Sequence, residues 1–460
     1  MPATSSAGPY RQLQMDDGRS APFYLLVFDK EGQCQSPLSL ARLLDEVNAG
    51  VYSHAHVFSH GWNNVFEDAV ELYQGFFDQY FALRKTHAPS KAEYRPVMVG
   101  IIWPSTLLVL PWEATPKIAG GPDAEAERKK AADDQALRDA AELLPAEKAN
   151  RLSALVEPGS SLKPEEAREL AEILLPVYQS AAAGAQETDD GKPAAELTAD
   201  DLLRLWMNAA PPREGRSGKP GFAKDEREAP TAAAFDWSML DPRWPVRLAS
   251  VLQMKDRAGR VGSNGVGPGL VQPLLSSGNV ETHLVGHSYG SKVVLSALCC
   301  RTPARPAASL LLLEPAVSYL CFGEDIDGQG RDGGYRSALA SVRQPVLSTF
   351  SSADAPLSKF FHRAAIRDAD WGEKRIAGMP PNRFAALGGY GPGGLKAGES
   401  KTIDVISPDG AAPGNRYPRG EAGIRIYGLD GSKGQITGHG DVATKYTAWA
   451  HLNLVAEGAF

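Results

Sequence analysis

Short apolar runs alternate along the chain with segments that repeat apolar residues at helical spacing. The apolar runs predict strands at 23–28, 54–59, 96–103, 282–286, 308–314, 345–350 and 423–428. The helical pattern predicts helices at about 38–49, 65–84, 290–301, 336–342, 355–366 and 441–456. Because strands that alternate with helices form parallel sheets covered on both faces, we expect an α/β fold with a mostly parallel central sheet.

Residues 118–235 interrupt this alternation with a stretch rich in Ala, Glu, Asp, Lys and Pro. Thr198 and Asp201 have the spacing of a capping box at a helix start. Apolar residues lie on one helical face at Leu170, Ile173, Leu174 and Val177, and on another at Leu203, Trp206 and Met207. We expect a helical cap inserted into a core formed by 1–117 and 236–460, with flexible segments near 180–196 and 210–232. Its apolar faces either line a pocket, as a lid would, or pack on the core.

Two other segments are rich in glycine. Residues 371–422 contain "LGGYGPGG" and "SPDGAAPGNRYPRG", which predicts long irregular loops. The stretch 257–269, "RAGRVGSNGVGPG", lacks the GK[ST] ending of a phosphate-binding loop, so we expect a loop that leads into the sheet.

The hexapeptide "VGHSYG" (285–290) stands where a predicted strand ends and a predicted helix begins. The pattern G-x-S-x-G at such a junction is typical of a nucleophile elbow, a sharp turn that exposes the hydroxyl of Ser288. Gly286 and Gly290 fit this turn because a Cβ atom at either position would collide with neighbouring backbone. The alternative is a tight turn with a buried serine.

A second motif, "HVFSHGWNN", follows the strand predicted at 54–59. His60 and Gly61 precede the bulky Trp62, a pattern that resembles the oxyanion loop of α/β-hydrolases. The resemblance implies that the amides of Trp62 and Tyr289 together bind an oxyanion. The alternative is an ordinary turn with Trp62 in the core. His54, His56 and His60 also share a strand face, but a metal site needs a further ligand and none is nearby.

The candidate general base is His439, in the glycine-flanked sequence "GHGD" after the last predicted strand. His283, His362 and His451 are expected to be packing or surface residues. The candidate acid is Asp354, because it follows the strand at 345–350 and gives the chain order Ser, Asp, His. Glu314 is its main rival, and Asp325 and Asp441 are weaker ones.

Taken together, "SHGWNN", "VGHSYG", the Asp354 loop and "GHGD" resemble the α/β-hydrolase superfamily, in its esterase and lipase branch. The resemblance covers about 1–115 and 245–460. It implies an α/β-hydrolase fold, a triad of Ser288, His439 and Asp354, and an oxyanion hole formed by the amides of Trp62 and Tyr289. The implied activity is hydrolysis of carboxylic esters through an acyl-enzyme intermediate.

Composition limits the classes of partner and ligand that this chain is expected to bind. The formal net charge of −7 and the lack of a Lys/Arg cluster argue against nucleic acid, and the four cysteines are too few and too unevenly placed for a zinc site or a disulfide framework. No apolar run approaches a membrane span, and no signal peptide is visible, which favours a cytoplasmic protein. We expect no cofactor and a small-molecule or lipid ester as substrate. A lipase or phospholipase, and a non-catalytic binding protein with the same fold, are the alternatives; the oligomeric state stays open.

Overall fold

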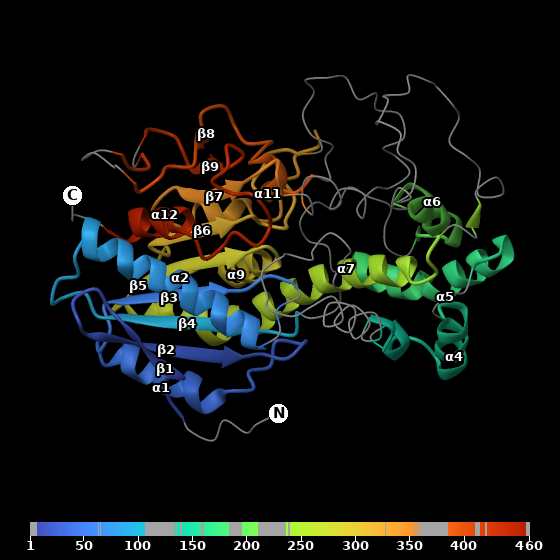
Figure 1. The fold of residues 1–460 in the computed structure, drawn as a ribbon, viewed down its shortest axis with the longest axis horizontal. Coiled ribbons are helices and arrows are strands. Elements are labelled where there is room, and N and C mark those ends of the chain that lie inside the picture. Colours follow the sequence, from blue (N-terminus) through green and yellow to red (C-terminus); the bar gives the residue numbers. More distant parts are fainter. Residues whose placement is uncertain are drawn as a thin grey trace.

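The structure of the 460-residue chain is a computed structural model, shown in Figure 1. It describes residues 7–456 apart from 63, 65, 106–133, 135, 139, 158–160, 184–195, 210–235, 238–239, 327, 355–356, 358–384, 410–414 and 419–420.

A nine-stranded sheet runs through the molecule in the order β1-β2-β4-β3-β5-β6-β7-β9-β8. Its strands are β1 (Arg11–Gln14), β2 (Ser20–Val27), β3 (His54–Ser59), β4 (Pro96–Ile102), β5 (Glu281–His287), β6 (Ser309–Leu313), β7 (Val346–Phe350), β8 (Ser400–Asp404) and β9 (Ile426–Asp430). Only β1 is antiparallel to its neighbour, β2; the other pairs are parallel. The predicted α/β class with a mostly parallel sheet is therefore confirmed.

Each of the seven predicted strands corresponds to one of the observed strands. The two strands that the pattern did not predict, β1 and β8, lie at the edges of the sheet. β8 also falls inside the stretch 371–422 that was expected to be irregular, so that expectation was wrong at this point. Its residues Ser400–Asp404 are mostly polar and half-exposed, and the apolar alternation of an inner strand is therefore absent.

Helices cover both faces of the sheet. Side chains alternate between these faces along each strand, so an inner strand made of apolar residues needs cover on both sides. In β4, Val97 and Val99 pack with α1 (Pro37–Asn48) and α9 (Tyr289–Cys299) on one face. Met98 and Ile102 pack with α2 (Phe66–His87) and α12 (Lys445–Val455) on the other. The helix expected at 336–342 is a short 3-10 turn, Arg336–Leu339, and most of the one expected at 355–366 lies outside the described residues.

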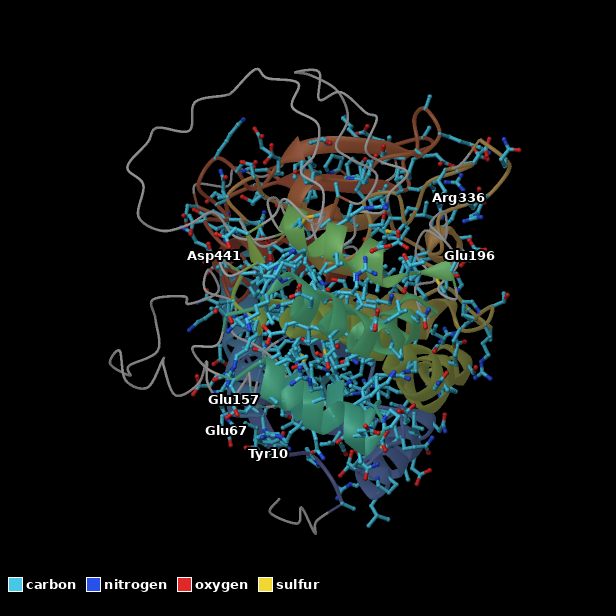
Figure 2. The ribbon with its side chains drawn as sticks, turned by 90° about the vertical axis from the view of Figure 1, so that its right-hand side faces the viewer. Tyr10, Glu67, Glu157, Glu196, Arg336 and Asp441 are labelled. Carbon is cyan, nitrogen blue, oxygen red and sulfur yellow. The ribbon has the colours of Figure 1, made fainter. Side chains whose placement is uncertain are left out.

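Between β4 and β5 the described chain forms helices and no strand. Four of these helices are α4 (Ala146–Leu155), α5 (Pro164–Ala183), α6 (Ala199–Ala209) and α7 (Trp244–Arg260). They extend as an arm from one side of the sheet in Figure 1, and Figure 2 views the molecule from that side, with the arm in front.

The apolar faces of the arm are packing surfaces. Leu203 and Trp206 are 3% and 0% exposed, and the Trp206 indole N–H donates to the Tyr178 hydroxyl over 3.0 Å. That hydroxyl in turn donates to the Pro245 carbonyl in α7. The expected capping box is also present, since Thr198 N–H donates to Asp201 and the Asp201 N–H donates back to the Thr198 hydroxyl. Of the two interpretations of these faces, packing is the one that the buried side chains favour.

The glycine-rich stretch 257–269 is not a loop, which corrects the expectation from sequence. α7 continues directly into a π-helix, Val261–Val271, and then into α8, Gln272–Ser277. A Cβ atom on Gly262 would lie 2.4 Å from the Val293 carbonyl oxygen, and one on Gly265 would lie 2.2 Å from that of Gly32. The glycines thus allow the π-helix to pack closely against α9 and against the backbone at Gly32. The high glycine content of this stretch therefore reflects close backbone packing and not a loop.

No helix in the described parts of the chain is both long enough and apolar enough to cross a membrane.

Candidate active site

Ser288 occupies a strained turn between β5 and α9. Its φ of 53° and ψ of −123° are unusual for a residue with a side chain. A Cβ atom on Gly286 would lie 2.5 Å from the Ser291 Cα, and one on Gly290 would lie 2.0 Å from the Ser59 carbonyl oxygen. The two glycines are therefore required by the turn, as the motif predicts.

The neighbouring strand braces this turn from both sides. Ser288 N–H donates to the Leu313 carbonyl over 3.0 Å, and Ala316 N–H donates to the Ser288 carbonyl over 3.2 Å. Glu314, which lies between Leu313 and Ala316, has a positive φ of 39° itself. Two strained residues, each directly after the end of a strand, thus lie beside the same pair of backbone hydrogen bonds.

His439 bridges Ser288 and Asp354. Its Nδ1 lies 2.7 Å from the Asp354 Oδ2, and its Nε2 lies 2.8 Å from the Ser288 Oγ. Because a carboxylate only accepts, Nδ1 carries the proton and Nε2 is left to accept from the serine hydroxyl. Asp354 is fully buried, whereas the His439 side chain is 21% exposed. The structure thus brings together the three residues predicted from the sequence.

The loop of the acid and the loop of the base are tied to each other. The Ser351 hydroxyl donates to the Ile436 carbonyl over 2.9 Å and accepts from the Ala353 N–H. The second oxygen of Asp354 accepts the Leu357 N–H over 3.0 Å. The carboxylate is therefore fixed on both oxygens, and the imidazole that it orients is fixed with it.

Glu314, the rival acid, lies close to the site without joining it. It is fully buried at the end of β6, and its Oε1 accepts from the Thr349 hydroxyl over 3.0 Å. Its Oε2 has no hydrogen-bond partner among the described residues. Burial, and then the negative charge of Asp354, raise the pKa of Glu314 to about 8. Of the two carboxyl groups, only Asp354 is hydrogen-bonded to His439. The weaker rivals, Asp325 and Asp441, hydrogen-bond elsewhere.

The loop after β3 passes directly over Ser288. A Cβ atom on Gly61 would lie 2.7 Å from the Ser288 Cβ, so this position also requires glycine. The ring of Trp62 is partly buried and lies 6.2 Å from that of Tyr289. The backbone N–H of Trp62 has no hydrogen-bond acceptor among the described residues. Tyr289 is the first residue of α9, and the N-terminal end of a helix favours a nearby negative charge.

His60 is buried behind this loop. Its ring stacks on Trp103 at 5.6 Å, and burial lowers its pKa to about 4. His54 and His56 do not lie beside it. They join His283 and His451 in a separate buried cluster at the other end of β3 and β5. Within the described chain no three or more metal-ligating side chains converge on one point.

His283 and His451 are 2% and 0% exposed, as expected of packing residues, whereas His362 lies outside the described residues.

No protein-family model matches the chain, and no curated protein or solved structure matches it. The function is therefore inferred from the geometry of the site.

Three side chains at the site were not predicted from the sequence. His287 donates from Nε2 to the His439 carbonyl over 2.9 Å, and Tyr73 accepts from the His60 N–H over 2.8 Å. Asn64 donates to the carbonyls of the loop over Ser288. The only available signal was proximity: His287 and Asn64 stand within or beside the two motifs, and Tyr73 carries no signal in the sequence at all.

Proposed function

We propose that this protein is a serine hydrolase of the α/β-hydrolase fold that cleaves carboxylic esters through an acyl-enzyme intermediate. One observation carries the proposal. The Ser288 hydroxyl, on a strained turn, is hydrogen-bonded to a histidine whose other ring nitrogen is hydrogen-bonded to a buried carboxylate. A nucleophile, its base and an orienting acid in this geometry are the requirements for nucleophilic catalysis by serine.

In the first half-reaction, the Ser288 Oγ attacks the acyl carbonyl carbon while the His439 Nε2 takes the hydroxyl proton. Asp354 stabilises the imidazolium that results. The carbonyl oxygen becomes an oxyanion, for which the amides of Trp62 and Tyr289 are the proposed donors. Collapse of the tetrahedral intermediate expels the alcohol, which leaves with the proton from Nε2.

In the second half-reaction, water replaces the alcohol. His439 takes a proton from the water, whose oxygen attacks the acyl carbon of the Ser288 ester. The second tetrahedral intermediate then collapses, the Ser288 Oγ regains a proton from Nε2, and the carboxylic acid is released. The triad returns to its starting state, and the sequence consumes one water for each ester.

The test is hydrolysis of p-nitrophenyl esters that differ in acyl chain length, by the full chain and by Ser288→Ala. We expect release of p-nitrophenol by the wild type and a loss of at least about 10⁴-fold in kcat for the variant. The matched control is Ser291→Ala, which removes a hydroxyl three residues beyond Ser288 that donates to the Gly286 carbonyl over 2.8 Å. It leaves the proposed nucleophile in place and should retain hydrolysis.

The chain-length profile divides the alternatives. A maximum on short acyl chains supports an esterase, and a maximum on long acyl chains presented as an emulsion supports a lipase. Absence of hydrolysis of every ester by the folded wild type would contradict the proposal and favour a non-catalytic binding protein.

A further inference from the structure

Every carbonyl of the loop from His60 to Trp62 is occupied by a donor on the protein. The His60 carbonyl accepts from the Trp103 indole over 3.0 Å. The Gly61 carbonyl accepts from His60 Nδ1 over 2.8 Å and from Asn64 Nδ2 over 3.2 Å. The same Asn64 Nδ2 donates to the Trp62 carbonyl over 3.0 Å. The loop therefore has its acceptors satisfied, while the Trp62 backbone N–H has no acceptor among the described residues.

These contacts fix the direction of that N–H. A peptide group is planar and trans, so the Gly61 carbonyl and the Trp62 N–H point in opposite directions. Two donors hold the Gly61 oxygen, and the peptide plane can rotate only if both hydrogen bonds break. The direction of the Trp62 amide is thus set by His60 and Asn64, and neither side chain hydrogen-bonds to the Ser288 hydroxyl, whose partner is His439.

His60 is fixed as one of these donors. Because the Gly61 carbonyl only accepts, the Nδ1 atom of His60 carries the proton. The Nε2 atom of His60 is then free to accept a hydrogen bond from the backbone N–H of Trp103, over 3.4 Å. Burial lowers the pKa of His60 to about 4, which keeps the ring neutral with both roles intact.

Asn64 is held just as firmly at the other end of the loop. Its N–H donates to the Ser105 hydroxyl over 3.3 Å, and that hydroxyl donates to the Asn64 carbonyl over 3.1 Å. Ser105 follows β4 closely, so the backbone N–H and carbonyl of Asn64 are anchored beside the end of a neighbouring strand. The side chain thus connects a rigid part of the fold to two successive carbonyls of the loop.

We propose that Asn64 is a positioning residue that aims the Trp62 N–H at the oxyanion formed on Ser288. The inference rests on the proposed function, because the oxyanion exists only if Ser288 attacks a carbonyl. The hydrogen bonds of Asn64 go to Gly61, Trp62 and Ser105, and none goes to Ser288. Its removal should therefore weaken binding of the transition state while leaving binding of the ground state nearly unchanged.

The experiment compares Asn64→Asp and Asn64→Ala with the wild type in ester hydrolysis and in inhibition by a trifluoromethyl ketone, whose adduct with serine is an oxyanion. Asn64→Asp keeps the shape of the side chain but replaces the N–H donors with an acceptor. We expect kcat to fall about ten- to a hundredfold with KM within about threefold, because one oxyanion donor is misdirected and not removed. The inhibition constant should rise by about the same factor as kcat/KM falls.

The matched control is Asn279→Asp. Asn279 also donates from its carboxamide to one backbone carbonyl, that of Asn48, but in an exposed turn before β5. It should leave kcat and the inhibition constant unchanged. Ser105→Ala, which releases the anchor of Asn64 without altering its carboxamide, should reproduce the loss in kcat more weakly. Thermal unfolding of each variant shows which proteins are folded, and Ser105→Ala keeps the test open if a variant at 64 does not fold.

The outcomes separate the two proposals. An active wild type whose folded Asn64 variants keep kcat within about twofold, or lose kcat/KM through KM alone, would overturn the inference and leave the proposed function intact. An inactive wild type that also fails to bind the ketone would overturn the proposed function. Parallel losses in kcat and ketone affinity, with the control unchanged, support the role of Asn64.

Discussion

The Nε2 atom of His287 donates a hydrogen bond to the backbone carbonyl oxygen of His439, over 2.9 Å. The two rings lie 5.0 Å apart, and burial lowers the pKa of His287 well below the usual value, so this ring stays neutral. Because His439 lies in a loop between two glycines, the contact limits how far its backbone moves away from Ser288. The residue just before Ser288 therefore also holds the loop that carries His439.

We predict that His287→Leu lowers kcat for ester hydrolysis about tenfold, because the His439 loop loses one of its anchors. In His287→Gln the side-chain Nε2 can reach the same carbonyl, so this variant should recover most of the loss. Steady-state kinetics of the two variants provide the measurement. Equal activity of the two variants would show that the hydrogen bond has no part in positioning the base.

The identity of the acid is tested by a pair of isosteric substitutions. Asp354→Asn removes the charge that orients His439, and we predict a loss of about 10⁴-fold in kcat. Glu314→Gln changes a carboxyl group that does not contact the imidazole, and its loss should stay below about tenfold. The kcat values measured side by side decide the matter: a larger loss for Glu314→Gln would mean that the rival acid is the functional one.

Glu314 should also make the fold less stable at alkaline pH. Its pKa of about 8 in the folded chain lies above the ordinary value of 4.5. Between these values the folded chain binds more protons than the unfolded chain, so the free energy of unfolding falls as the pH rises through this window. We predict a smaller fall for Glu314→Gln, measured by urea denaturation at about pH 5 and about pH 8. Parallel losses in the two proteins would contradict the assignment.

The buried histidine cluster should make the fold sensitive to acid. Burial lowers the pKa of His54 to about 4 and of His451 to about 3, from an ordinary 6.5, and it also lowers the pKa values of His56 and His283 well below the usual value. The unfolded chain then binds more protons between about pH 6.5 and about pH 4. The free energy of unfolding is therefore predicted to fall as the pH drops through this window.

The charges that face the cluster strengthen this effect more than they oppose it. The Arg84 guanidinium of α2 and Arg343, which precedes β7, disfavour protonation of the rings, whereas the carboxylate of Glu281 favours protonation of His54. His283→Leu should flatten the acid side of the curve of unfolding free energy against pH. His87→Gln, at a half-buried position outside the cluster, is the control and should leave the slope unchanged. An equal slope in His283→Leu and the wild type would be evidence against the cluster as the cause.

The parts of the fold that the sequence predicted are those with a local cause. The inner strands are apolar runs because both of their faces are buried, and the turn at Ser288 is readable from two glycines two residues away on either side. The edge strand Ser400–Asp404 is polar and half-exposed, so it carries no such pattern. The sequence predicts a loop where the π-helix Val261–Val271 lies, because a high glycine content is found both in loops and in closely packed helices.

The site divides in the same way. His439 and Asp354 were predicted from their order along the chain and from the glycines around the histidine. The role of Asn64 depends on which carbonyls its carboxamide reaches, and the neutral states of His60 and His287 depend on complete burial. Contacts of this kind are set by tertiary structure, and no spacing in the sequence reports them.

The most direct test is covalent labelling of the intact protein with a fluorophosphonate, followed by mass spectrometry of its peptides. The reagent requires a serine that is activated as a nucleophile. We predict one adduct per chain, located on Ser288, with labelling abolished in Ser288→Ala and slowed at least about a thousandfold in His439→Gln. An unlabelled wild type, or labelling that persists undiminished in Ser288→Ala, would contradict the account.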